Sequence, residues 1–317
     1  MSLYHKKQEI ISRQILLMGD RVEISILCDE DQWPENLLES AVAEMKRIEY
    51  LFTGNDVLNP IKQINAQAGI KPVKINKEVY DVISRCMHVL EVTQDALKMI
   101  YYFNSKRAAS SGDAVQSLSP KKKSTQDFYR YVEFDKQHLT IFLNEKGLNL
   151  NLRNIAKGYA KDKAKYLLKQ NGVSSGIIKS ASEIVTWGTD LAGRIATFET
   201  GNFCMGDYAF SGINMSDLAI VTLDINEAHP VVERYKNVQL QAKKTACGGG
   251  IHTVTLVCSS AAMARCLHPS LVEIGLTGSL EFINQMQEVA VIVTDKHNTG
   301  FISKNVRLRK SSTLCAV

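Results

Sequence analysis

The order of apolar and polar residues along the chain follows two different periods. Residues 21–27 alternate valine and isoleucine with polar neighbours, and this period of two predicts a half-buried strand. Residues 34–52 and 77–100 repeat their apolar side chains at three- and four-residue intervals, which predicts two amphipathic helices. Pro34 fits the start of the first helix, where a missing N–H costs little.

The second half of the chain mixes the same two patterns. Residues 155–172 place alanine and leucine on one stripe and end at Gly172, which predicts a helix with a glycine stop. Further segments have the composition of strands: residues 129–135, 138–144, 174–188 and 290–295. Because strands and helices mix without a regular βα repeat, the predicted fold class is α+β. Residues 104–126 are rich in serine, alanine and lysine without a period, and we expect a mobile loop there.

Composition narrows the possible functions. The chain has 317 residues, 45% hydrophobic and 22% charged, with a formal net charge of +5, values that are ordinary for a globular protein. A charge this small does not predict nucleic-acid binding, so we expect the basic segments 119–125 and 306–312 to be solvated. We expect no transmembrane segment, because no apolar run approaches about 18 residues. The first residues show no signal peptide, so the chain reads as soluble as given and its localisation is left open.

Cysteine and histidine usage gives no catalytic or zinc-binding pattern. Seven cysteines without a C-x-x-C pair predict neither a zinc site nor a disulfide framework, and we expect them to be small buried side chains. No order of serine, histidine and aspartate suggests a catalytic triad, and no catalytic residue is assigned. We expect single histidines such as His88 and His229 to be surface or core residues rather than catalysts.

Two short motifs carry the remaining chemistry. Lys157, Gly158 and Tyr159 stand near the opening of the predicted helix, where backbone N–H groups and a lysine can meet an anion. A plain amphipathic helix with a solvated lysine face explains the same residues. The second motif is "RCLHPSL" (residues 265–271), which puts Arg265 and Pro269 where a helix is expected. Proline in a helix interior costs ~3 kcal/mol, unless it marks the start of a new helix.

The segments "IAKGYAKDKAK" (residues 155–165) and "TVTLVCSSAAMARCLHPSLVEIGL" (residues 253–276), in their order and spacing, resemble the ApbE family. These are FAD:protein FMN transferases, formerly called thiamine biosynthesis lipoproteins. The resemblance implies an α+β fold of mixed sheets with packed helices in two interleaved subdomains. It covers residues 15–308 as a single domain, which leaves an N-terminal tail (1–14) and a C-terminal tail (309–317). It also implies FAD and magnesium as cofactors, with FMN passed to a Ser or Thr hydroxyl of a target protein.

The family's cofactor-binding positions can be carried over onto this sequence. They fall on Met18, Gly19, Ala96, Leu97, Lys98, Asn151, Lys157, Gly158, Tyr159 and Glu183. Several of these depart from the family pattern. Asp20 stands where a small hydroxyl residue is expected, Lys98 replaces an aspartate, and Asn151 replaces another. Ser182 and Glu183 stand where related sequences have Gly-Asp.

The family's metal positions fall on Asn154, Arg265 and Pro269. Arginine has no acceptor to offer a metal ion, and proline has no side-chain oxygen. The resemblance therefore implies a magnesium site that this chain has lost, and no metal ligand is assigned.

The sequence leaves several functions open. The main interpretation of the sequence is an ApbE-like protein that is catalytically impaired. One alternative is an active FAD:protein FMN transferase with displaced ligands. Another is a metal-independent flavin or nucleotide binder, in which Lys98, Lys157 and Arg265 face a diphosphate. A third is a protein that acts through its surface on a protein partner. Family members are often exported and lipid-anchored, but no lipobox is visible here.

Overall fold

The computed structural model divides the chain into two compact units, each built from separated segments. The first unit comprises Met1–Arg47, Lys157–Asn226 and Gly248–Val317, and the second comprises Ile48–Ala156 and Glu227–Cys247. Within them the structure describes residues 8–29, 33–92, 100–103, 115–117, 131–188, 217–224, 251–286, 288–295 and 299–304. Helices and antiparallel sheets occur together, which confirms the predicted α+β class and its interleaved subdomains.

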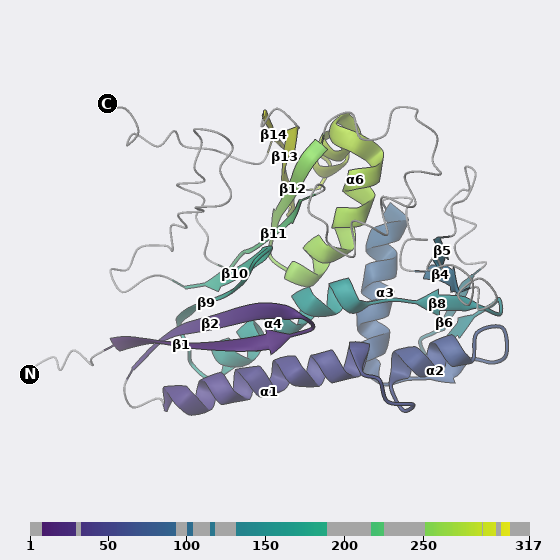
Figure 1. Ribbon diagram of the computed structural model, residues 1–317, viewed down its shortest axis with the longest axis horizontal. Helices are drawn as coiled ribbons and strands as arrows, with labels where there is room; N and C mark the ends of the chain where they lie inside the picture. The colour runs from purple at the N-terminus through teal and green to yellow at the C-terminus, as the bar shows by residue number, and fades with distance from the viewer. Residues whose placement is uncertain are drawn as a thin grey trace, which may run out of the picture. The chain divides into compact units, whose positions relative to one another are not determined.

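One large sheet organises the first unit (Figure 1). It has eight strands in the order β1-β2-β9-β10-β11-β12-β13-β14, each antiparallel to its neighbours. The strands are β1 (Gln8–Leu17), β2 (Asp20–Asp29), β9 (Ser175–Ser180), β10 (Glu183–Trp187), β11 (Ala219–Asp224), β12 (Ile251–Cys258), β13 (Ala290–Asp295) and β14 (Gly300–Ile302). Short hairpins join β1 to β2 and β9 to β10, so sequence neighbours pair directly.

Three helices of the described residues contribute to this unit. They are α1 (Pro34–Thr53) up to Arg47, α4 (Arg153–Gln170) from Lys157 onwards, and α6 (Ala261–Ile283). Helix α6 packs along β10, β11, β12 and β13, and Figure 1 shows it running beside these strands. The alanine stripe predicted for α4 is buried, with Ala160 and Ala164 both 0% exposed.

The two faces of the sheet carry different residues, because successive side chains of a strand point to opposite sides. Glu183, Val185 and Trp187 share one face of β10, and all three are buried. The Trp187 indole Nε1–H donates a hydrogen bond to the Val173 carbonyl at 3.1 Å. Gly176 of β9 pairs with Trp187 of β10. A Cβ at residue 176 would meet the indole ring, so only glycine leaves room for the tryptophan.

The opposite face holds an apolar cluster that crosses four strands. Ile184, Ile220, Val257 and Ile292 form its buried centre, one residue from each of β10, β11, β12 and β13. Every residue of β10 is buried as a result, since both of its faces are covered. A strand of this kind reads as a continuous apolar run, and Glu183 is the charged exception at its start.

The second unit contains short strands and helices. Its helices include α2 (Pro60–Ala66) and α3 (Lys77–Val92), and its strands are β3 (Val73–Lys74), β4 (Ile100–Phe103), β5 (Val115–Ser117), β6 (Val132–Asp135), β7 (Thr140–Leu143) and β8 (Leu148–Leu150). They form two three-stranded sheets, β3-β7-β6 and β5-β4-β8. Asn59 caps α2, since its side-chain oxygen accepts hydrogen bonds from the N–H groups of Ile61 and Lys62.

Several predicted boundaries differ from the structure. Strand β1 begins at Gln8, inside the segment predicted as an N-terminal tail, because its pairing with β2 supplies the order that its weak alternation did not reveal. The helix predicted for 77–100 ends at Val92 in the described residues, and the β-branched and aromatic run at Ile100–Phe103 forms β4 instead. Strand β5 lies within the predicted loop 104–126, where β4 pairs with it. The predicted C-terminal tail, 309–317, lies outside the described residues.

A two-residue turn joins β1 to β2 and sets the start of β2. Leu17 pairs with Asp20 across it, and both central residues have positive φ, 48° at Met18 and 86° at Gly19. This is the pattern of a type I′ turn, whose twist matches that of the paired strands. Asp20 is therefore held at a fixed point, directly after the turn.

Replacing Gly19 by alanine tests how much this turn depends on its left-handed backbone. A Cβ at Gly19 meets no atom within 4 Å, so the cost is conformational rather than steric. We expect Gly19→Ala to lower the free energy of unfolding by about 1 kcal/mol in urea titrations, and Gly19→Asn to lower it less, because asparagine tolerates positive φ. Equal losses for the two variants would contradict this explanation.

Candidate functional site

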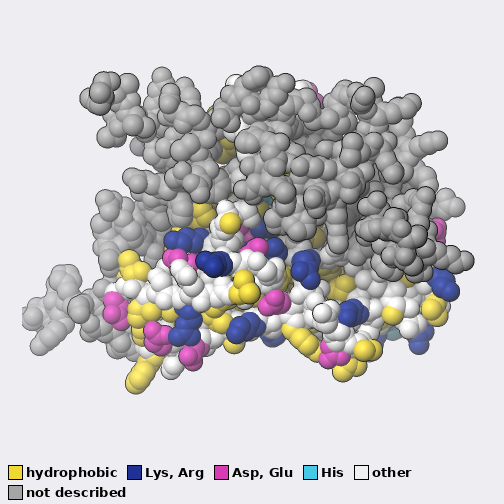
Figure 2. All heavy atoms as spheres, in the orientation of Figure 1, with side chains coloured by type: hydrophobic (Ala, Val, Ile, Leu, Met, Phe, Trp, Pro, Cys, Tyr) yellow, Lys and Arg dark blue, Asp and Glu magenta, His cyan; other side chains and the backbone are white. Residues whose placement is uncertain are grey.

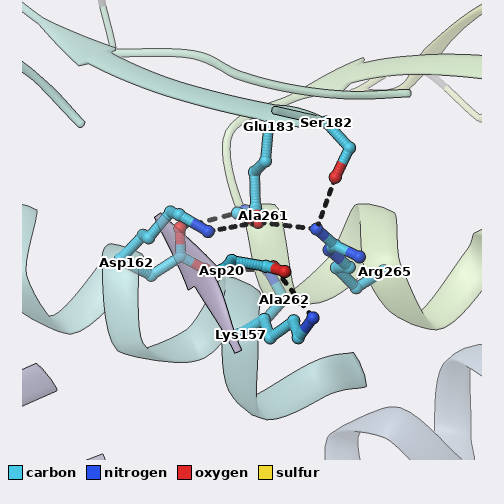
Figure 3. A network of polar contacts seen from close by, with 9 residues as sticks. Asp20, Lys157, Asp162, Ser182, Glu183, Ala261, Ala262 and Arg265 are labelled. Atoms are coloured by element: carbon cyan, nitrogen blue, oxygen red, sulfur yellow. Dashed lines mark hydrogen bonds and ion pairs between the residues drawn. The ribbon is translucent and has the colours of Figure 1, made fainter. Parts of the chain in front are cut away.

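Charged side chains from four elements of the first unit gather beside the N-terminus of α6 (Figure 3). The sheet supplies one carboxylate from the start of β2 and another from the start of β10. Helix α4 supplies two lysines and an aspartate, and α6 supplies an arginine. The residues are Asp20, Lys157, Lys161, Asp162, Glu183 and Arg265.

Glu183 is the centre of this cluster. Its side chain is 0% exposed, and its Oε2 lies 2.5 Å from the Lys161 Nζ and 2.9 Å from an Arg265 Nη2. Lys161 is 1% exposed and Arg265 10% exposed, so both cations are also withdrawn from water. The same Arg265 nitrogen donates a hydrogen bond to the Ser182 hydroxyl at 3.1 Å. One buried carboxylate thus joins α4, α6 and the β9–β10 hairpin.

The electrostatic balance of the cluster favours an ionised Glu183. Burial by itself would raise the pKa of Glu183, but the Arg265 and Lys161 cations more than offset it and hold that pKa below its ordinary value. Burial lowers the pKa of Lys161, and the Glu183 carboxylate opposes that change. Arg265 and Asp20 also act on the pKa of Lys161, which places them within electrostatic range of it.

Two buried polar atoms of the cluster have no hydrogen-bond partner among the described residues. They are the Glu183 Oε1, an acceptor, and the Arg265 Nε, a donor. Unpaired buried polar atoms are uncommon in folded proteins and cost free energy. The guanidinium of Arg265 therefore retains a donor that its protein neighbours do not use.

Lys157 forms a third ion pair in the cluster, with Asp20. Its Nζ lies 2.8 Å from the Asp20 Oδ2, and its side chain is 7% exposed against 24% for Asp20. The Met18-Gly19 turn places Asp20 at the first position of β2, where it reaches the lysine. The carboxylate that replaces the expected hydroxyl residue is thus directly paired with the lysine of the Lys-Gly-Tyr motif.

Asp162 holds the start of α6. Its carboxylate accepts hydrogen bonds from the Ser260 hydroxyl (2.7 Å) and from the N–H groups of Ala261 (2.9 Å) and Ala262 (3.0 Å). These N–H groups belong to the first turn of α6, which has no intrahelical acceptors for them, and a negative charge is favourable at a helix N-terminus. Burial nevertheless raises the pKa of Asp162 to about 6, against the hydrogen bonds that lower it.

Gly158 allows α4 to approach α6 this closely. A Cβ at Gly158 would lie 2.5 Å from the carbonyl carbon of Ala261 and 2.6 Å from the backbone nitrogen of Ala262. Any side chain there would have to push α6 away from α4, because the obstruction is backbone. The glycine of the motif therefore sets the spacing between the two helices, and the hydrogen bonds of Asp162 depend on that spacing.

Of the positions to which the resemblance assigns metal ligands, Arg265 and Pro269 do not fit a magnesium ion. Arg265 presents a guanidinium, which has donors only and is already paired with Glu183. Helix α6 runs on through Pro269 without restarting, contrary to the alternative of a second helix, and proline offers no side-chain oxygen. His268 is buried, its Nε2 lies 2.9 Å from the Val254 carbonyl oxygen, and burial lowers its pKa to about 4. The described residues include no group of three or more His, Cys, Asp or Glu side chains that could hold a metal ion.

The structure brings together some of the predicted site residues. Lys157, Glu183 and Arg265 belong to the cluster, with Gly158 beside it and the Met18-Gly19 turn leading into it. Other predicted positions lie outside it or are not described. Asn151 precedes α4, and its side chain accepts a hydrogen bond from the Arg153 N–H. Asn154 is the second residue of α4, and Tyr159 lies on the same helix with its side chain partly exposed. The remaining predicted positions, Ala96, Leu97 and Lys98, lie outside the described residues.

Sequence reasoning missed Lys161 and Asp162, which contribute as much to the cluster as the predicted residues. The row Lys157, Lys161 and Lys165 repeats every four residues, and all three side chains are buried, so the solvated lysine face is wrong for this row. The usable signal was the four-residue spacing, which puts these lysines on the same side of the helix as Ala160 and Ala164. Lysines that share a face with buried alanines need carboxylate partners.

The surface of the described residues carries mixed charge. On the face drawn in Figure 2, basic and acidic side chains are interspersed among the described atoms. Exposed pairs such as Arg13 with Glu35 and Lys169 with Asp217 show the same mixing. Among the helices of the described segments, none has both the length and the apolar character needed to cross a membrane.

Replacing Glu183 by glutamine removes the charge that compensates Lys161. We expect Glu183→Gln to lower the free energy of unfolding by about 3 kcal/mol, because a buried ammonium group loses its counter-charge. A matched control is Glu23→Gln, which removes a carboxylate from the part-exposed ion pair with Lys179 (2.9 Å) and should cost less than about 1 kcal/mol. If urea unfolding gave a similar decrease in the free energy of unfolding for both variants, the buried ion pair would contribute no more to stability than the part-exposed one.

Asp162 gives the stability a defined dependence on pH. Burial raises the pKa of Asp162 in the folded protein to about 6, above its ordinary value of 3.8, so between these values the native state holds a proton that the unfolded state does not. Lowering the pH through this window therefore stabilises the native protein relative to the Asp162→Asn variant. We expect the stability advantage of the wild type to be about 1 kcal/mol larger at a pH of about 5 than at about 7.5. A difference that is constant with pH, measured by urea unfolding, would contradict this assignment.

The fold is similar to those of solved structures. The ApbE protein of Thermotoga maritima superposes with a TM-score of 0.68 at 18% identity, over 93% of this chain and 97% of that chain. The flavin transferase ApbE of Vibrio cholerae superposes with a TM-score of 0.70 at 14% identity, over 94% of this chain and 98% of that chain. The flavinyl transferase ApbE of Pseudomonas stutzeri, in its apo form, gives a TM-score of 0.68 at 16% identity, over 96% and 98%. At these identities the similarity shows the fold.

Sequence comparison reaches the same family independently. The FAD:protein FMN transferase of Klebsiella pneumoniae (strain 342) is 21% identical over 308 residues, which are 95% of this chain and 94% of the relative. A sequence model of the ApbE family matches residues 18–293, and this range includes every residue of the charged cluster. Because that match covers most of the sequence, the chain belongs to the ApbE family.

Proposed function

We propose that this chain is a flavin-nucleotide-binding member of the ApbE family whose magnesium-dependent transfer of FMN to proteins is impaired. The observation that carries the proposal is the ion pair between Arg265 and Glu183. Arg265 stands at a position that the family resemblance assigns to a metal ligand. Its guanidinium, a permanent cation, is 10% exposed and bound to the protein's own carboxylate there.

A divalent cation would supply positive charge that polarises a diphosphate and stabilises its leaving group. The position assigned to a ligand oxygen instead holds a positive charge, which repels a metal ion and cannot coordinate it. Pro269, one helical turn further on, removes a second oxygen. The loss of two ligands on one helix face supports impaired transfer more strongly than the loss of either alone.

The retained features support binding of a flavin nucleotide. The Lys157-Gly158-Tyr159 motif is intact on α4, and Gly158 keeps the close approach of α4 and α6. The relative from Klebsiella pneumoniae is named for an FAD-dependent reaction on a protein, and it matches this chain over nearly its whole length. We therefore propose FAD as the ligand and a protein as the partner, with binding rather than transfer as the retained activity.

A second candidate function is active transfer with displaced metal ligands. The near-complete coverage of a named FAD:protein FMN transferase favours it, and so does the intact lysine motif. Asp20 and Glu183 are carboxylates in the cluster that could in principle be released to a metal ion. Both are paired with cations in this structure, which favours the impaired form.

A transfer assay separates the two candidates. The protein is incubated with FAD, Mg²⁺ and a protein substrate carrying an acceptor Ser or Thr, and the mass of the substrate is followed by mass spectrometry. We expect no detectable addition of FMN, while the Klebsiella pneumoniae relative modifies the same substrate in parallel. Binding is read separately, from the flavin absorbance that the protein retains after gel filtration with FAD.

The outcomes are distinct. Retained flavin without transfer supports the proposal. Transfer at a rate within about tenfold of the relative, a difference of only ~1.4 kcal/mol in barrier, would overturn it in favour of the active enzyme. If the protein stays colourless and modifies nothing, flavin binding is contradicted, and action on a protein partner through its surface is the alternative that remains.

A further inference from the structure

The charged cluster is neutralised from within. Its cations are Lys157, Lys161 and Arg265, and its carboxylates are Glu183, Asp162 and Asp20. The Glu183 carboxylate pairs with Lys161 and Arg265, and the Asp162 carboxylate accepts hydrogen bonds from N–H groups of α6. Asp20 is the carboxylate that remains for Lys157. Formal charges therefore balance only while Asp20 is part of the cluster.

Asp20 is also the carboxylate best able to leave. Its side chain is 24% exposed, whereas Glu183 is 0% exposed and contacts two cations. Moving Asp20 away from Lys157 breaks a single ion pair and leaves one largely buried ammonium group, 7% exposed, without its counter-charge. Moving Glu183 would leave two buried cations uncompensated, which is far more costly.

Opening of the Asp20–Lys157 ion pair would leave Lys157 without its partner. Arg265, in the same charged cluster, has an Nε–H donor that no described residue accepts. An ammonium group and a planar guanidinium are the donors that bind phosphate oxygens most effectively in proteins. The chemistry exposed is therefore that of an anion site, and neither cation offers an atom to a metal ion.

We propose that the Asp20 carboxylate competes with an anionic ligand for Lys157. When the Asp20–Lys157 ion pair opens, the site binds a nucleoside diphosphate without a divalent cation. This inference rests on the proposed flavin-nucleotide binding, since it names the contact that limits its affinity. Asp20 is a specificity-determining residue in this scheme, because its charge disfavours phosphate at Lys157. No covalent step is involved.

Calorimetric titration of ADP in EDTA tests the inference directly. We expect Asp20→Ser, which places a small hydroxyl residue after the Met18-Gly19 turn, to tighten ADP binding on the order of tenfold relative to wild type. The isosteric Asp20→Asn variant should shift affinity in the same direction. Adding Lys157→Met to Asp20→Ser should remove the gain, and adenosine, which has no phosphate, should bind all variants equally.

Glu23→Gln is a matched control. Glu23 lies on β2 three residues after Asp20, its side chain is 25% exposed, and it pairs with Lys179 at 2.9 Å. Removing its charge changes the net charge of the protein by the same amount as Asp20→Ser does. We expect ADP affinity to stay at the wild-type value in this variant. Thermal unfolding of each variant, followed by circular dichroism, confirms that the proteins compared are folded.

The outcomes decide the inference separately from the proposed function. Equal ADP affinity in wild type, Asp20→Ser and Asp20→Asn would overturn it, as would an equal gain in Glu23→Gln. Persistence of the gain after Lys157→Met would also overturn it, because the anion would then bind elsewhere. FMN transfer in the separate assay would reject the impaired enzyme, yet it would leave the ADP comparison in EDTA unaffected.

Discussion

The Glu183 carboxylate is fully buried on the helix-facing side of the sheet, and the arrangement of the first unit depends on its compensation. A single carboxylate in an apolar interior is too costly to remain ionised alone. Lys161 from α4 and Arg265 from α6 approach it from two helices, so both helices are fixed against the start of β10. The need to compensate the Glu183 charge therefore sets both the positions of the two helices and the charges of the cluster.

This requirement also explains how a position that the resemblance assigns to a metal ligand can hold an arginine without loss of the fold. A metal ion brings charge that must be balanced by protein carboxylates, and an arginine brings charge of the same sign through its own side chain. Arg265 keeps a cation next to Glu183, and Asp20 keeps an anion next to Lys157. Arg265 and Glu183 both depart from the pattern that the resemblance implies, and they are paired with each other, whereas Asp20 is paired with Lys157 of the intact motif.

The sequence predicted the architecture better than it predicted the cluster. Period-two alternation located β2, and helical spacing located α1 and α4, because burial of one face imposes these periods. The resemblance also singled out Arg265, a cation at a position that it assigns to a metal ligand. The sequence could not pair Arg265 with Glu183, which lies 82 positions away, and it left a solvated lysine face open as an explanation of the buried lysine row of α4. Partners of this kind are set by tertiary packing, which local patterns do not record.

The cap on α6 has a consequence for how the chain folds. Asp162 precedes the N–H groups that it satisfies by 99 and 100 positions, and the helix-capping Ser260 hydroxyl donates to the same carboxylate. Helices usually obtain their caps from adjacent residues, so they gain part of their stability before they dock. In α6 the adjacent Ser260 caps the Met263 N–H, whereas the acceptor for the Ala261 and Ala262 N–H groups arrives only with docking of α4, through contact at Gly158. Completion of the first turn of α6 is therefore coupled to a contact between segments far apart in the sequence, and contacts of this kind form late because the intervening chain must first be closed into a loop.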